Sequence, residues 1–183
     1  MESIIKYMSR NFTTILIIAV AWYTTLKING YIFLSLEQTP IANLIFLPAA
    51  YRPAMILIYG DVGALGLILG GYLAEGCHGL DRVMQALISG GGPYLVVTAG
   101  KRFLQIPSSL AGLKPSHIII LSVSCAATNA IALNVYGWAF GYVDSSLHQL
   151  AAIFVGDVTG CAIFLFALST ALSFVMPRPQ ADR

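Results

Sequence analysis

Long apolar runs separated by short polar connections are the feature that most constrains this sequence. Such runs occur at residues 12–28, 41–59, 62–75, 83–100, 118–138 and 150–175. A helix crosses the hydrocarbon core of a bilayer with about 20 apolar residues, and most of the runs approach that length. The pattern predicts an all-α, polytopic integral membrane bundle of about six transmembrane helices. We expect residues 1–183 to form it as a single domain, with no soluble catalytic domain.

The composition of the chain agrees with a lipid environment. Apolar residues make up 57% of the sequence and charged residues only 10%, whereas soluble domains carry about 25% charged residues. A water-soluble fold of this size has too little interior to bury so much apolar surface. The net charge is only +2, and no basic patch is interleaved with aromatic residues. We therefore expect the lipid bilayer, and not a nucleic acid, as the chain's surroundings.

The distribution of basic residues predicts the orientation of the bundle, because lysine and arginine favour the cytoplasmic side. With the N-terminus inside, Lys27 and Arg82 fall at the outer side. The remaining basic residues outside the spans fall inside, and they are Lys6, Arg10, Lys101, Arg102, Lys114, Arg178 and Arg183. Both termini are thus predicted to be cytoplasmic. The start of the chain resembles a signal peptide, but apolarity continues beyond Ala21, and we expect a retained helix.

Two ionisable residues lie within the predicted spans. A charge at the centre of a bilayer costs at least about 2.5–3.5 kcal/mol. Arg52 in the second span and Asp157 in the sixth both lie roughly 10–17 Å from the outer end of their helices, at 1.5 Å per residue. We predict that they form an ion pair facing the bundle interior. The pair is either part of a polar pocket in which Arg52 binds a small anionic ligand, or a structural clamp between two helices.

Three small polar residues lie near the predicted pair. Thr128 and Asn129 occur in the fifth span at a depth comparable with that of Asp157, and Thr159 follows Asp157 by two residues. An asparagine inside a membrane helix requires a hydrogen-bond partner. We predict that the three residues complete the polar pocket. The alternative for Asn129 is a single interhelical hydrogen bond.

Pairs of glycines four residues apart occur in two spans. Gly156 and Gly160 flank Asp157, and Gly66 and Gly70 lie in the third span. Small residues at this spacing let two membrane helices approach closely. Both pairs are therefore predicted to be helix-packing faces.

Two segments carry residues that disrupt helices. Pro48 and Pro53 frame Arg52, and residues before proline avoid the α region, so the second span is predicted to begin with a broken or re-entrant piece. Gly91 and Gly92 precede Pro93 in the fourth span. We predict that this run opens the fourth helix, as in the broken helices that line transporter binding sites. A simple kink is the alternative.

The sequence offers no machinery for catalysis or metal binding. The three cysteines, Cys77, Cys125 and Cys161, show no CxxC spacing, and the spacing of the histidines fits no metal site. No nucleophile with a base, phosphate-binding glycine loop or HExxH motif is present. We expect no enzyme activity, no catalytic residue, no metal and no cofactor.

Two stretches together resemble the bacterial membrane-associated sensor domain of the first type. The segment from Phe46 through Arg52 to Gly60 is similar to the opening of that family's second helix. Gly156-Asp157-Val158-Thr159-Gly160 matches the Gly-Asp-x-x-Gly signature of its last helix. The likeness covers residues 12–175. The family is an all-helical membrane module at the N-terminus of histidine kinases and diguanylate cyclases, so the resemblance implies the bacterial inner membrane and a role in sensing or signal transduction.

This chain departs from the family in two respects. Ala49 follows Pro48 where the family has a second proline, and the family's tryptophan is missing. We expect no effector domain after Arg183, and we therefore expect any signal to pass through another membrane protein. The leading hypothesis is a non-enzymatic, sensor-like or regulatory membrane module with a ligand pocket. The alternatives are a substrate-binding membrane subunit of a small-molecule transporter and an accessory structural subunit of a larger membrane complex.

Overall fold

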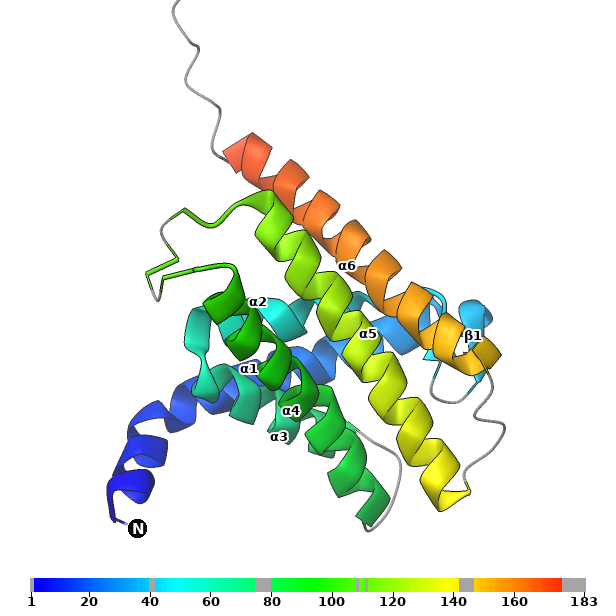
Figure 1. Ribbon diagram of the computed structural model, residues 1–183, viewed down its shortest axis with the longest axis horizontal. Helices are drawn as coiled ribbons and strands as arrows, with labels where there is room; N and C mark the ends of the chain where they lie inside the picture. The colour runs from blue at the N-terminus through cyan, green and yellow to red at the C-terminus, as the bar shows by residue number, and fades with distance from the viewer. Residues whose placement is uncertain are drawn as a thin grey trace, which may run out of the picture.

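The computed structural model describes residues 2–39, 42–74, 80–107, 109–110, 112–141 and 147–175. This part of the chain is helical apart from one small β-hairpin (Figure 1). Its elements in order are α1 (Glu2–Ile32), η1 (Leu34–Leu36), β1 (Glu37–Thr39), β2 (Ala42–Asn43), η2 (Leu47–Ala50), α2 (Tyr51–Tyr59), α3 (Asp61–Ala74), α4 (Leu80–Phe103), α5 (Pro115–Phe140) and α6 (Leu147–Val175). The all-α prediction is confirmed, and the antiparallel β1–β2 hairpin is an addition to it.

Three helices of the described chain are long and apolar enough to cross a membrane. They comprise Ser9–Ile32 within α1, Pro115–Phe140 and Leu147–Thr170. Large apolar side chains cover the outside of the molecule, among them Ile17, Leu95, Trp138 and Phe166. Monomeric soluble proteins rarely expose such surfaces. The structure is therefore compatible with a membrane bundle.

The prediction of six full-length spans is wrong at the second and third segments. Helix α2 has 9 residues and α3 has 14, which at 1.5 Å per residue gives about 14 Å and about 21 Å. The hydrocarbon core is about 30 Å thick, so neither helix crosses it alone. The apolar run 41–59 is divided because the hairpin and the 3-10 turn η2 occupy its first part. Gly60, with a φ of 57°, then ends α2 and reverses the chain.

Helix α4 is 24 residues long, about 36 Å, but charged residues occupy its ends. Asp81 lies in its first turn, and Lys101 and Arg102 lie in its last turn. The stretch between them, residues 83–100, is uncharged, but Gln85, Ser89, its glycines and Pro93 make it less apolar than the three helices above. The length of α4 nevertheless matches that of a membrane span.

Helices α2 and α3 form a tight hairpin that packs on α1. Gly63 of α3 lies against the backbone carbonyl of Met55 in α2, where a Cβ would collide with that carbonyl oxygen. Gly66 and Gly70 face α1, and Cβ atoms at these positions would lie 2.6 Å from Ile18 Cβ and 2.7 Å from the Ala19 carbonyl oxygen. Gly66 and Gly70 therefore occupy a close helix–helix contact, as the sequence predicts.

Gly156 and Gly160 of α6 were predicted to pack against another helix, but they contact the non-helical backbone from β2 to η2 instead. A Cβ on Gly156 would collide with the carbonyl oxygen of Asn43, and one on Gly160 with the carbonyl oxygen of Phe46. The Phe46 amide donates a hydrogen bond of 3.0 Å to the Gly156 carbonyl. The segment between the hairpin and η2 thus runs directly along α6. The missing side chains of Gly156 and Gly160 make room for it.

The predicted opening of the fourth helix at Gly91, Gly92 and Pro93 is also wrong. Helix α4 runs without interruption through Pro93. The adjacent glycines serve packing: Gly90 fits against Ala64 and Ile68 of α3, and Gly92 faces Thr128 of α5. A proline inside a helix removes one backbone hydrogen bond, and α4 nevertheless continues through Pro93 between packed neighbours.

The connections gather at two ends of the bundle (Figure 1). The hairpin, the start of α4, the end of α5 and the start of α6 lie to the right of the view, whereas the start of α1, the end of α4 and the start of α5 lie to the left. Lys101, Arg102 and Lys114 belong to the second end. We call the end with the hairpin the outer end and the opposite one the inner end.

Candidate functional site

An ion pair joins α2 to α6 inside the bundle. Arg52 Nη1 donates to Asp157 Oδ2 at 2.5 Å, and both side chains are almost fully buried. Asn129 Nδ2 of α5 donates to the same carboxylate oxygen at 2.9 Å. The structure thus brings together three of the five residues predicted for the polar pocket. One carboxylate thus connects α2, α5 and α6.

Local structure explains how Arg52 reaches this depth. Pro48 lies in the first turn of η2, which leads directly into α2 because Ala50 already has helical dihedral angles. Pro53 lies in the first turn of α2, where a missing N–H costs little. The chain therefore enters the bundle from the outer end as a short helix that starts beside Arg52. The predicted broken start of the second span takes this form.

Two aromatic rings hold the Arg52 guanidinium. Its Cζ lies 5.5 Å from the ring of Trp22 and 5.3 Å from that of Phe46, distances at which cation–π attraction is effective. The two rings meet edge to face, with centroids 6.4 Å apart. Arg52 is thereby fixed by α1, by the segment before η2 and by Asp157.

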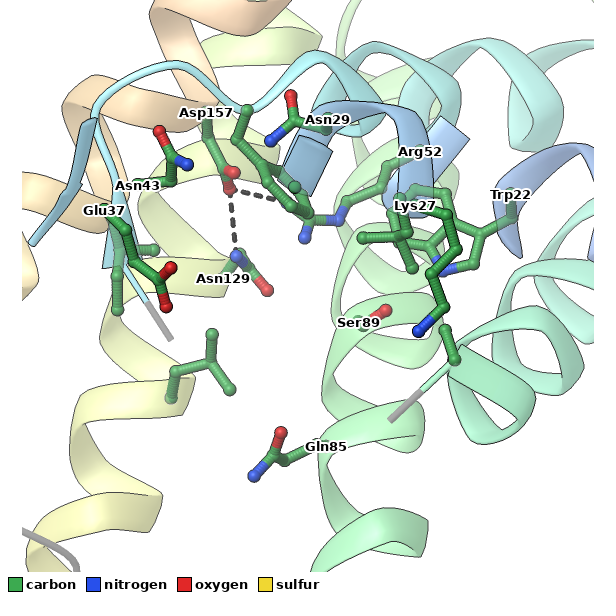
Figure 2. Close-up of a pocket in the computed structure, with 16 residues that line it drawn as sticks. Trp22, Lys27, Asn29, Glu37, Asn43, Arg52, Gln85, Ser89, Asn129 and Asp157 are labelled. Carbon is green, nitrogen blue, oxygen red and sulfur yellow. Dashed lines mark hydrogen bonds and ion pairs between the residues drawn. The ribbon is translucent and has the colours of Figure 1, made fainter. Parts of the chain in front are cut away.

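A cavity of about 440 Å³ adjoins this cluster (Figure 2). The members of the ion pair, Asn129 and Trp22 line it, together with Ser89 of α4 and residues near the hairpin. Its apolar wall includes Leu26, Leu133 and Ile153. Binding sites for small molecules occupy about 300–1,000 Å³. The cavity therefore has the volume of a site for a small ligand.

Four polar atoms around this cavity are buried without a hydrogen-bond partner in the described part of the chain. They are Trp22 Nε1, Arg52 Nε, Ser89 Oγ and Asn129 Oδ1. Each has lost its contact with solvent and gained no hydrogen bond in return, which costs roughly 1–3 kcal/mol per group. A fifth such atom, Asn134 Nδ2, belongs to a residue that does not line the cavity. Unsatisfied polar atoms are thus concentrated at this one place.

Charged and polar residues surround the mouth of the cavity. Lys27 of α1 and Glu37 of β1 are exposed and lie at opposite sides of it, and Gln85 of α4 lies between them (Figure 2). Asn29 and Asn43 fix the hairpin nearby: Asn29 Oδ1 accepts from the Leu47 amide at 2.9 Å, and Asn43 Nδ2 donates to the Phe33 carbonyl at 3.0 Å. The cavity opens toward the outer end.

Two predicted pocket residues lie elsewhere. Thr128 and Thr159 are half-buried and do not line the cavity. Thr128 faces Gly92 of α4 instead. Asn129, which follows Thr128, and Asp157, two residues before Thr159, occupy the inward faces of their helices. Neither threonine therefore faces the cavity. Prediction from depth alone does not distinguish the faces of a helix.

Sequence reasoning missed Trp22, Ser89, Lys27 and Glu37. Trp22 and Ser89 carry no charge and lie in apolar runs, so no local signal marks them. Lys27 lies near the end of the first predicted span and Glu37 in the connection that follows it. Only the fold of the hairpin brings them to one cavity.

Within the described ranges, no three His, Cys, Asp or Glu side chains lie close enough to hold a metal ion. Cys125 and Cys161 are buried and free, whereas Cys77 lies outside the described residues. Comparison with known proteins gave no match: no family model, no curated protein and no solved structure is significantly similar to this chain.

Proposed function

We propose that this chain is a non-enzymatic integral membrane module that binds a small polar molecule in the cavity beside Arg52 and Asp157. The observation that carries the proposal is the cluster of four unpartnered polar atoms around one cavity. Native proteins pair nearly all their buried polar groups. A molecule that enters the cavity and pairs these groups recovers part of their cost as binding energy. Ligand binding is thereby coupled to four helices at once.

The proposed membrane arrangement follows from helix length and charge. Helices α1, α4, α5 and α6 cross the bilayer, and the short α2–α3 hairpin enters from the outer side and returns to it. This arrangement keeps both termini cytoplasmic, as six spans would, because the hairpin replaces two crossings. Lys101, Arg102 and Lys114 then lie at the cytoplasmic side, in agreement with the positive-inside rule. The cavity faces the periplasmic side of a bacterial inner membrane.

We retain a sensor-like or regulatory role, acting through a partner membrane protein, as the proposed consequence of binding. Its support is the resemblance in the Gly156–Gly160 segment together with the ion pair that Asp157 makes. The transport alternative is weaker, because the opened fourth helix that favoured it is a continuous α4. The accessory-subunit alternative is weaker as well, because the glycine faces of α3 and α6 already contact this chain's own backbone.

The orientation is testable with cysteines placed at the two ends. In a background carrying Cys77→Ser, Cys125→Ala and Cys161→Ala, Lys114→Cys should react with an impermeant thiol reagent only from the cytoplasmic side. Leu147→Cys, which is 86% exposed, should react only from the periplasmic side. Reaction of both from the same side would contradict the arrangement.

Binding is testable by native mass spectrometry of the full chain purified in mild detergent. We expect a bound, non-lipid small molecule on the wild type. It should be absent from a Ser89→Leu variant, whose larger side chain fills the cavity wall, and present on a Thr159→Val control. Ordered water satisfies buried polar groups almost as well as a ligand does. If water alone fills the cavity, the wild type, Ser89→Leu and Thr159→Val should give the same spectrum, both before and after incubation with a bacterial metabolite extract. That result would refute ligand binding.

A further inference from the structure

The charged side chains that line the cavity are separated by sign into two walls, to which Trp22 and Asn129 add one side chain each. Trp22, Lys27 and Arg52 lie on one side of the cavity, and their side chains offer N–H donors. Glu37, Asn129 and Asp157 lie on the other side, with acceptor oxygens (Figure 2). The donor wall comes from α1 and α2, and the acceptor wall from β1, α5 and α6. A ligand that satisfies both walls must carry an acceptor group at one end and a donor group at the other.

The charges of the lining are balanced. Lys27 and Arg52 contribute two positive charges, and Glu37 and Asp157 contribute two negative ones. A ligand with a net negative charge would be repelled by the carboxylates of the acceptor wall. A ligand with a net positive charge would be repelled by the cations of the donor wall. A molecule without net charge but with separated charges meets both walls favourably.

The unpartnered atoms repeat this division at the buried end of the cavity. Trp22 Nε1 and Arg52 Nε are donors, Asn129 Oδ1 is an acceptor, and Ser89 Oγ can act as either. Trp22, Arg52 and Asn129 are between 1% and 4% exposed. They are therefore fixed by packing. The two walls meet at this buried end, where Arg52 Nη1 donates to Asp157 Oδ2.

From these walls we propose that the ligand is a small zwitterion of the amino-acid type. Its carboxylate faces Trp22, Arg52 and Lys27, and its ammonium group faces Asn129 and Glu37. Leu26, Leu133 and Ile153 supply an apolar wall for a short side chain. The volume of about 440 Å³ lies in the lower half of the range of about 300–1,000 Å³ for small-molecule sites. This assignment rests on the proposed function, since it names the ligand class of the same cavity.

The test uses the full chain in lipid nanodiscs, with binding measured by isothermal titration calorimetry. Each protein amino acid is titrated in turn, followed by the N-acetyl and the amide derivatives of the one that binds best. The three compounds share a carbon skeleton and differ in charge. We expect each blocked derivative to bind at least about tenfold more weakly, which corresponds to one lost charged hydrogen bond.

Two exposed residues give a charge-specific control. Glu37→Gln removes the partner of the ammonium group, so it should weaken binding of the amino acid about fivefold. The difference in affinity between the amino acid and its N-acetyl derivative should become smaller for the same reason. Lys27→Gln should instead reduce the difference in affinity between the amino acid and its amide derivative. Trp22→Phe, which keeps a ring against Arg52, should weaken the amino acid about five- to tenfold. Thr159→Val should bind all three compounds like the wild type.

The outcomes separate this assignment from the proposed function. Equal binding of the N-acetyl derivative, or of the amide, would overturn the zwitterion assignment. A second outcome is that no amino acid binds, while a metabolite extract still contains a ligand that binds the wild type and not Ser89→Leu. This outcome would overturn the zwitterion assignment and leave the proposed binding function in place. If neither amino acids nor extract bind, both proposals fall.

Discussion

The inner and outer halves of the bundle are held together in different ways. Toward the inner end, apolar side chains such as Ile56, Val97 and Leu121 are fully buried against one another. Toward the outer end, the Arg52–Asp157 pair adjoins a cavity whose walls contain four unpartnered polar atoms. The outer half gives up stability at these atoms, and the packing of the inner half compensates for it. Apolar packing and the polar cavity are thus placed in different halves of the molecule.

The largest expected effect breaks the outer half at its ion pair. Asp157→Leu leaves the buried Arg52 guanidinium without its counter-ion, and we expect a loss of about 3–5 kcal/mol in the free energy of unfolding. The double variant Arg52→Met with Asp157→Leu should recover most of this loss, because no charge remains buried. Denaturation in mixed micelles measures both. Equal stability of the wild type and the single variant would show that the pair contributes nothing.

A second change disturbs the backbone contact between α6 and the segment before η2. Gly160→Ala places a Cβ against the Phe46 carbonyl, and overpacking of this kind costs about 1–3 kcal/mol. Gly91→Ala is the matched control, because no atom lies within 4 Å of the added Cβ. It should stabilise α4 by roughly 0.5–1 kcal/mol. The two thermal midpoints should therefore move in opposite directions. A similar midpoint for both variants would contradict the close contact along α6.

A third change tests whether the inner half acts on stability alone. Leu121→Ala removes a fully buried side chain, and we expect a loss of about 1–3 kcal/mol. This is below the 2–5 kcal/mol typical of soluble cores, because in lipid the separated helices remain in an apolar solvent. The dissociation constant of the ligand, measured below the unfolding temperature, should stay within about twofold of the wild type. A large loss of affinity would show that the halves are not independent.

The sequence predicted what depends on depth and charge. Arg52 and Asp157 are ionisable residues at similar depth, and the cost of an unpaired charge in lipid forces such groups together. Asn129 followed from the same argument. The roles of the glycines and of Pro93 were harder to predict, because the backbone preferences of a residue do not reveal which elements pack against it. Gly90 and Gly92 pack against α3 and α5, so the backbone of α4 stays helical where the sequence alone suggested an opening.

The rest of the cavity lining was not predictable from the sequence. Trp22 and Ser89 look like ordinary members of apolar runs, and their unpartnered atoms exist only because α1, α2 and α4 meet at that point. The short α2–α3 hairpin was concealed for a similar reason. In the sequence, the apolar runs at 41–59 and 62–75 look like two spans. Only the structure shows that the β1–β2 hairpin and η2 occupy part of the first run and that the chain reverses at Gly60.

The smallest expected effect tests the central claim most directly. Ser89→Ala removes an unpartnered hydroxyl and no protein hydrogen bond. Without ligand, we expect the variant to have an unfolding midpoint equal to or above that of the wild type, because the cost of roughly 1–3 kcal/mol for an unpaired group disappears. When a metabolite extract is added, we expect its midpoint to rise less than that of the wild type. A lower midpoint without ligand, or no rise for the wild type with the extract, would contradict the claim that these atoms are kept for a ligand.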